Sequence, residues 1–163
     1  MQAEVMVLQF DRGWSIVSTC LVYGTSVGSR QSRITWVYPQ LKRGEKIRIV
    51  DDQVSTPTNV HNLVQGIVSI IQTGSSGIFH LSGDEILTPY QMAIKTAQFC
   101  ALESGLIERV NAKIFTQPAA RSAITGFNIE KAKSVLGFIP TPFDKALTRI
   151  FPPDEVKNPD PAR

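Results

Sequence analysis

Residues 15–23 form a near-continuous run of β-branched and apolar side chains, Ser-Ile-Val-Ser-Thr-Cys-Leu-Val-Tyr, which ends at Gly24. A run of this kind is typical of a buried strand, often one in a parallel sheet that is covered on both faces. Residues 59–73 have the periodicity of a helix, with apolar side chains every three or four positions and Thr58 placed to cap it. Strands that alternate with helices predict an α/β fold with a sheet that is parallel at least in part.

Shorter patterns complete this prediction. Further strands are expected at 46–50, 77–83 and 110–115, and further helices at 2–11, 34–41, 88–101, 128–136 and 141–150. The helix at 88–101 has the clearest start, because Thr88-Pro89-Tyr90-Gln91 combines a capping threonine, a proline in the first turn and a glutamine three residues after the cap. A sheet with so few strands has an unpaired edge unless another segment or chain covers it. We therefore expect an incomplete domain.

Composition excludes several classes of protein. The 163 residues are 42% hydrophobic and 19% charged, as expected of one soluble globular domain. Lysine and arginine are scattered and the net charge is only +3, which argues against a nucleic-acid partner. No apolar run approaches the ~20 residues of a membrane span, and no basic leader opens the chain. Cys20 and Cys100 lack metal-ligand spacing and are expected to be free thiols, so we predict a cytoplasmic protein without a metal site.

Four motifs follow one another in an order that identifies a family. They are Thr-Cys-Leu-Val-Tyr-Gly at 19–24, Lys-Ile-Arg-Ile-Val-Asp-Asp-Gln-Val-Ser-Thr-Pro-Thr at 46–58, Gly-Ile-Phe-His-Leu-Ser-Gly at 77–83, and Ala-Arg-Ser at 120–122 before a segment that ends in Leu136-Gly137. In this order they resemble the C-terminal portion of dTDP-4-dehydrorhamnose reductases, which are extended short-chain dehydrogenases in the NAD(P)-dependent sugar-nucleotide reductase and epimerase superfamily. The resemblance covers about residues 1–151.

The resemblance implies a fold and its division. The chain is expected to be α/β, the C-terminal part of an NAD(P)-binding Rossmann-like extended short-chain dehydrogenase fold together with its substrate-binding subdomain. Residues 1–24 would be the end of the Rossmann-like core, as a helix tail and a strand. Residues 25–151 would be the substrate-binding portion with the remaining core elements, and residues 152–163 a disordered tail.

The resemblance also implies an activity for the complete protein. Family members use NAD(P)H to reduce a 4-keto sugar nucleotide, with a catalytic Tyr and Lys four residues apart. Gln2-Ala3-Glu4 matches the stretch that follows this Lys, so the catalytic pair would lie before Met1. None of the eleven glycines forms the Gly-rich turn that holds a dinucleotide. We therefore expect a nucleotide-sugar-binding portion that is inactive alone, with NAD(P)H and a homodimer belonging to the complete protein. The alternative is a non-catalytic regulatory module, like the regulatory subunit of methionine adenosyltransferase.

Arg121 is the first substrate-binding residue that the resemblance implies, since a guanidinium can bind a diphosphate with two parallel hydrogen bonds. Its alternative is an ordinary surface arginine. Ser122 replaces the proline that usually follows in the family. Tyr23, Arg30 and Ser32 lie at or after the first strand, where relatives contact the substrate, although the last two can be solvated loop residues.

Asp52, Gln53 and Thr56 lie at the end of a strand, where open α/β sheets bind ligands. Their structural alternative is to hold the loop and cap the helix that follows. Two departures from the family, Ser18 for an arginine and Leu21 for a tryptophan of some rhamnose reductases, leave the identity of the keto sugar open.

Overall fold

The strands of the computed structural model, which describes residues 2–9, 13–25, 32–115 and 122–152, form three two-stranded parallel sheets. The pairs are β1 (Ser15–Ser18) with β5 (Gly77–His80), β2 (Val22–Tyr23) with β4 (Thr58–Asn59), and β3 (Ile47–Val50) with β6 (Ile107–Val110). The helix α3 (Val60–Thr73) lies between the strands of the first sheet in sequence, and α4 (Pro89–Phe99) lies between those of the third. The predicted α/β class with parallel strands is thus confirmed.

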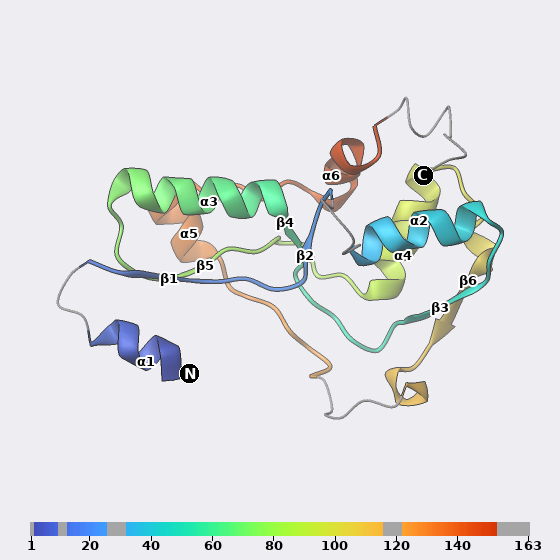
Figure 1. The fold of residues 1–163 in the computed structure, drawn as a ribbon, viewed down its shortest axis with the longest axis horizontal. Coiled ribbons are helices and arrows are strands. Elements are labelled where there is room, and N and C mark those ends of the chain that lie inside the picture. Colours follow the sequence, from blue (N-terminus) through green and yellow to red (C-terminus); the bar gives the residue numbers. More distant parts are fainter. Residues whose placement is uncertain (1, 10–12, 26–31, 116–121, 153–163) are drawn as a thin grey trace.

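The described residues form six α-helices and two short 3-10 helices. They are α1 (Gln2–Leu8), α2 (Arg33–Lys42), α3 (Val60–Thr73), α4 (Pro89–Phe99), α5 (Glu130–Leu136) and α6 (Phe143–Ile150), with the short 3-10 helices η1 (Ser104–Leu106) and η2 (Ala112–Ile114). Figure 1 shows α3 and α5 beside β1 and β5, and α2 and α4 beside β3 and β6, with β2 and β4 between the two groups.

Each part of the fold has its own core. Phe79 and Leu81 centre a cluster between α3, α5 and β5, and Ala97 lies in a second cluster between α2, α4 and β3. The third cluster joins α6 to the rest through Phe143 and Leu147, which are almost fully buried. Both cysteines are free thiols, as predicted.

The predicted strand at 15–23 is interrupted. β1 ends at Ser18, β2 begins at Val22, and the two strands pair with different partners. The break lies at Leu21, whose φ of 42° is in the left-handed region that non-glycine residues rarely adopt. The prediction of one continuous strand is wrong because apolar composition does not report a turn that distant residues impose.

Two local predictions also need correction. Thr58 does not cap α3: its side chain is fully buried and donates a hydrogen bond to the carbonyl of Cys20 (2.6 Å), and Asn59 caps the helix by accepting from the His61 amide (2.8 Å). The strand predicted at 110–115 is also misplaced: β6 lies earlier, at Ile107–Val110, and η2 follows it. The disordered tail predicted at 152–163 lies, after Pro152, outside the described residues.

The helix α3 turns most of its apolar stripe to solvent. Val64, Val68 and Ile71 are 53%, 42% and 73% exposed. Its buried positions are instead Asn62, Gly66 and Ile70. A Cβ at Gly66 would lie 2.6 Å from Leu81, so glycine permits the close approach of α3 to the segment after β5.

We expect this exposed stripe to drive self-association, because contiguous exposed apolar surface promotes it. The double substitution Val64→Lys, Ile71→Lys should reduce light scattering at high protein concentration while changing the free energy of unfolding by less than about 1 kcal/mol, as for two surface sites. Gln72→Lys is the matched control, since it adds a charge to the same exposed helix without removing an apolar side chain. Equal effects of the control and the double variant would mean that charge, and not the stripe, governs association.

Candidate functional site

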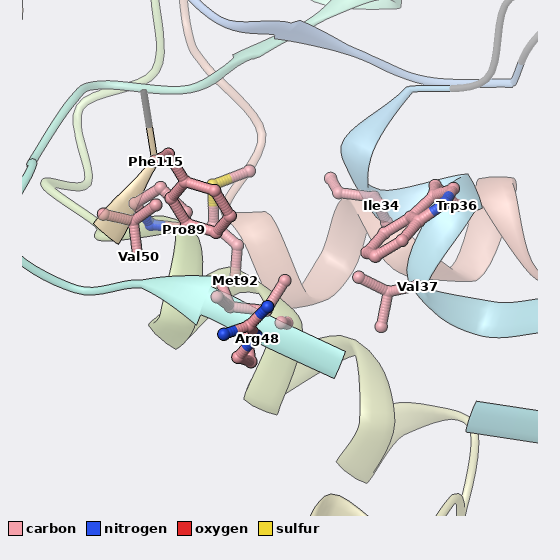
Figure 2. Close-up of a pocket in the computed structure, with 10 residues that line it drawn as sticks. Ile34, Trp36, Val37, Arg48, Val50, Pro89, Met92 and Phe115 are labelled. Atoms are coloured by element: carbon pink, nitrogen blue, oxygen red, sulfur yellow. The ribbon is translucent and has the colours of Figure 1, made fainter. Parts of the chain in front are cut away.

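A cavity of about 270 Å³ opens between α2, β3 and the start of α4. It is lined by Ile34, Trp36, Val37, Arg48, Ile49, Val50, Pro89, Met92, Ala93 and Phe115. Figure 2 shows the side chains of α2 on one side and Phe115, Pro89 and Val50 on the other. Arg48 is the charged residue of this lining. An apolar, partly aromatic cavity with one cation suits a flat ring that carries an anionic group.

The strand β3 explains how the arginine reaches an otherwise apolar wall. Arg48 and Val50 share one face, because successive side chains of a strand point to opposite faces, and Ile49 of the opposite face lines the cavity as well. Ile47 faces the other way and is buried in the core between α2 and α4.

A second cavity, of about 310 Å³, lies at the end of β1. It is lined by Cys20, Leu21, Gln53, Val54, Ser55, Pro89, Ser122 and Thr125. Hydroxyl and amide groups are more frequent in this lining than in that of the first cavity. Because Pro89 lines both cavities, the two are adjacent. Each is near the lower end of the about 300–1,000 Å³ typical of small-molecule sites, so an elongated ligand with two different parts would need both.

The loop that walls the second cavity is fixed from two sides. Ser55 and Leu87 exchange backbone hydrogen bonds of 3.0 and 2.9 Å. Val54 donates to the carbonyl of Ala123 (2.8 Å) and accepts from the amide of Thr125 (2.9 Å). The backbone of this wall is therefore hydrogen-bonded to a neighbouring segment on each side.

Asp51 has a structural position beside this loop. It accepts a hydrogen bond from the Thr88 hydroxyl and forms an ion pair with Arg109. Its amide donates to the carbonyl of Val110 (3.0 Å). Asp51 thereby joins the end of β3 to β6 and to the start of α4, the element that brings Pro89 to both cavities.

The residues implied by the resemblance have different positions. Gln53 lines the second cavity. Asp52 accepts a hydrogen bond from the amide of Ala112 (3.0 Å), and Ser32 caps α2 by accepting from the amide of Thr35 (3.2 Å). Thr56 is buried, and its hydroxyl donates to Ser82 (3.1 Å). These contacts fit the structural alternative for Asp52 and Thr56, and the substrate-binding role of each remains a prediction.

Tyr23 lies in the core and not in the lining of either cavity. Its ring packs against Phe143 with centroids 5.1 Å apart, and burial raises the pKa of its hydroxyl to about 12 despite a hydrogen bond with Asn59. The phenol therefore keeps its proton at neutral pH. Arg30 and Arg121 lie outside the described residues.

Sequence reasoning missed the first cavity. Phe115 is predicted as part of a strand, and Trp36 carries no site prediction, but both line the cavity and are more than a third exposed. Arg48 left a partial signal, because it alternates with Ile47 and Ile49 in the strand predicted at 46–50.

Neither a metal site nor a dinucleotide site is evident in the part of the chain that the structure describes. No three His, Cys, Asp or Glu side chains gather there as metal ligands. The N-termini of α2, α3 and α4 are each capped by a side chain, which occupies a backbone amide that a bound pyrophosphate would need. These helix ends do not fit a pyrophosphate, so no chemical step through NAD(P)H is assigned to these residues. Within the same ranges, no helix is long and apolar enough to cross a bilayer.

The model of the RmlD substrate binding domain matches residues 1–155 of the chain. The chain belongs to the RmlD substrate-binding domain family. The resemblance seen in the sequence is thereby confirmed, and the family match includes both cavities and the strands and helices that form them.

The relatives that this RmlD-type chain matches are longer than the chain itself. It is 29% identical over 160 residues to a dTDP-4-keto-6-deoxy-D-glucose reductase of Streptomyces niveus, covering 93% of this chain and 51% of the relative. It is similar to the NADP complex of a dTDP-4-dehydrorhamnose reductase from Bacillus anthracis, with a TM-score of 0.79 and 25% identity, covering 91% of this chain and 51% of that one.

A more distant structure shares the fold. A UDP-glucuronic acid 4-epimerase from Bacillus cereus, solved with UDP-glucuronic acid and NAD, gives a TM-score of 0.71 at 17% identity, covering 94% of this chain and 48% of that one. The chain thus spans about half the length of these relatives. The predicted Rossmann-like extended short-chain dehydrogenase fold is confirmed by the likeness to the Bacillus anthracis reductase.

Proposed function

We propose that this chain is the nucleotide-sugar-binding portion of an NAD(P)H-dependent reductase that resembles dTDP-4-dehydrorhamnose reductase. The observation that carries the proposal is the pair of adjacent cavities, one aromatic with a cation and one rich in hydroxyl and amide groups, within the RmlD-type domain. A nucleotide sugar has the same sequence of parts, namely a flat base, an anionic diphosphate and a polyhydroxylated ring.

The base would occupy the first cavity. Trp36 and Phe115 offer aromatic surface for a planar ring, and Met92 closes the cavity from α4. Arg48 would bind the negative charge that follows the base, through hydrogen bonds stronger than those of a neutral donor. Arg121, outside the described residues, is proposed to bind the diphosphate as well.

The sugar would lie in the second cavity. Gln53, Ser55 and Thr125 supply donors and acceptors for sugar hydroxyls, while Leu21 and Val54 offer apolar contact for the ring carbons. Fixing the ring against an ordered loop limits its orientations, which is the main contribution that a binding portion makes to a group-transfer reaction. Hydride and proton transfer in the complete protein would come from NAD(P)H and residues elsewhere.

We expect Arg48→Gln to weaken dTDP binding by about 10-fold or more, since a hydrogen bond to a charged group contributes about 1.5–3 kcal/mol and 1.4 kcal/mol equals a factor of ten. Titration of the 163-residue chain can follow the fluorescence of Trp36 in a Trp14→Phe background, because these are the two tryptophans of the sequence. NADPH should produce no saturable change.

Arg43→Gln is the matched control for this substitution. Arg43 is exposed, pairs with Glu45 (2.7 Å) and lines neither cavity, so its loss should leave dTDP affinity unchanged. Equal affinities of the two variants, or no binding of dTDP by the parent chain, would contradict the proposal. Turnover of a 4-keto sugar nucleotide by a longer form that includes this chain would separate a reductase from a non-catalytic regulatory module.

A further inference from the structure

The backbone at Leu21 is held in an unfavourable conformation at the wall of the second cavity. Its φ of 42° is one of two positive values among the non-glycine residues that the structure describes. The other, at Ala101, follows the end of α4, where a left-handed residue is common. Leu21 instead lies between two strands, so its surroundings must stabilise the turn.

Thr58 provides this stabilisation. Its amide donates to the carbonyl of Leu21 (3.2 Å), and its hydroxyl donates to the carbonyl of Cys20 (2.6 Å). The same hydroxyl accepts a hydrogen bond from the side chain of Thr19 (2.9 Å). One fully buried threonine thus contacts three consecutive residues of the turn, without lining either cavity itself.

The turn determines what the second cavity can hold. Cys20 and Leu21 both line the cavity, so the turn between β1 and β2 forms part of its wall. The Cys20 thiol also donates to the carbonyl of Thr56 (3.0 Å), so this wall is connected to the loop on its far side. A wall that is set before binding spares the ligand the ordering cost.

We infer that Thr58 is a positioning residue that holds the left-handed turn at Leu21 and thereby shapes the cavity for the sugar ring. The inference rests on the proposed function, since it takes the second cavity as the sugar site. It adds a specific prediction: loss of the Thr58 hydroxyl should weaken recognition of the sugar and leave recognition of the nucleotide intact.

The test compares two ligands, dTDP and dTDP-4-keto-6-deoxy-D-glucose, on the 163-residue chain. Thr58→Val keeps the shape and the amide of residue 58 but removes the hydroxyl. We expect its affinity for the sugar nucleotide to fall about 10-fold, the size of one or two buried hydrogen bonds, and its affinity for dTDP to stay unchanged. Thr58→Ser retains the hydroxyl and should restore sugar-nucleotide binding. Unchanged dTDP affinity also shows that each variant is folded.

A second pair of variants tests the turn itself, should Thr58→Val fail to fold. Leu21→Ile preserves side-chain volume but places a β-branched residue at a positive φ, which is strongly disfavoured, whereas asparagine tolerates this region. Leu21→Ile should therefore show the same selective loss of sugar-nucleotide binding, and Leu21→Asn should bind better than Leu21→Ile.

The outcomes separate this inference from the proposed function. If the unsubstituted chain binds neither ligand, both the proposed function and the positioning role of Thr58 are overturned. Normal binding of both ligands by Thr58→Val and Leu21→Ile, or an equal loss of both, would overturn the positioning role alone. Selective loss with rescue by serine is the expected result.

Discussion

Replacing Phe79 with alanine is expected to lower the free energy of unfolding by about 3–5 kcal/mol, the usual cost of truncating a fully buried phenylalanine. The side chain is 1% exposed on β5 and packs in the cluster that contains Leu81 and Phe138. The ammonium group of Lys131 lies 4.4 Å from its ring centroid and would lose that contact as well. Since small domains are stable by about 5–15 kcal/mol, this single change brings the chain close to unfolding.

Ile78→Ala is the matched control for this prediction. Ile78 precedes Phe79 on the same strand, points to the opposite face and is 45% exposed, so its loss should cost well under half as much. Urea denaturation followed by circular dichroism measures both variants. Similar losses for the two would mean that both faces of β5 are equally buried in solution, for instance by association of chains.

Local signals in the sequence predicted those elements whose stabilising groups lie within a few residues. The start of α4 is the clearest case, because Thr88 and Gln91 form the expected capping box with hydrogen bonds of 2.8 and 3.0 Å. The alternation at 46–50 likewise gave β3 almost to the residue. In both segments, the local sequence pattern and the burial favour the same structure, so no distant contact overrides them.

Distant contacts explain the errors. The sequence predicts Thr58 as the cap of α3, but its hydroxyl donates to the carbonyl of Cys20, and the same bond helps to break the predicted strand at 15–23. The exposure of α3 is a similar case, since periodicity shows that a helix has an apolar side but not which side its neighbours cover. Here the buried side is the one that carries Asn62, whose side-chain oxygen accepts a hydrogen bond from the Thr141 amide (2.9 Å).

The candidate site was predictable only where it follows a strand. Gln53 was identified because ligands bind at the ends of strands in α/β sheets, and it lines the second cavity. The first cavity combines Trp36, Arg48 and Phe115 from three separate segments. Nothing in the sequence shows that these side chains meet, because their proximity depends on how α2 and η2 pack around β3.

Gly83→Ala is expected to destabilise the chain by about 3 kcal/mol or more, at the upper end of what overpacking costs. A Cβ at this position would lie 2.3 Å from the carbonyl oxygen of Pro57. A flexible side chain can rotate away from such a clash, but a backbone carbonyl cannot move without its peptide. The segment before Thr58 would therefore shift, and with it the loop that walls the second cavity.

Gly13→Ala is the control for this change. A Cβ there would meet the hydroxyl of Ser76 at 3.1 Å, and that side chain can rotate, so stability should fall by less than about 1 kcal/mol. Urea denaturation gives the stability of each variant, and tryptophan fluorescence gives its affinity for dTDP and for the sugar nucleotide. We expect Gly83→Ala to lose sugar-nucleotide affinity under conditions in which it remains folded, because Pro57 precedes the threonine that holds Leu21. Full sugar-nucleotide affinity in a folded Gly83→Ala variant would show that the loop tolerates displacement, and would argue against a fixed wall at the second cavity.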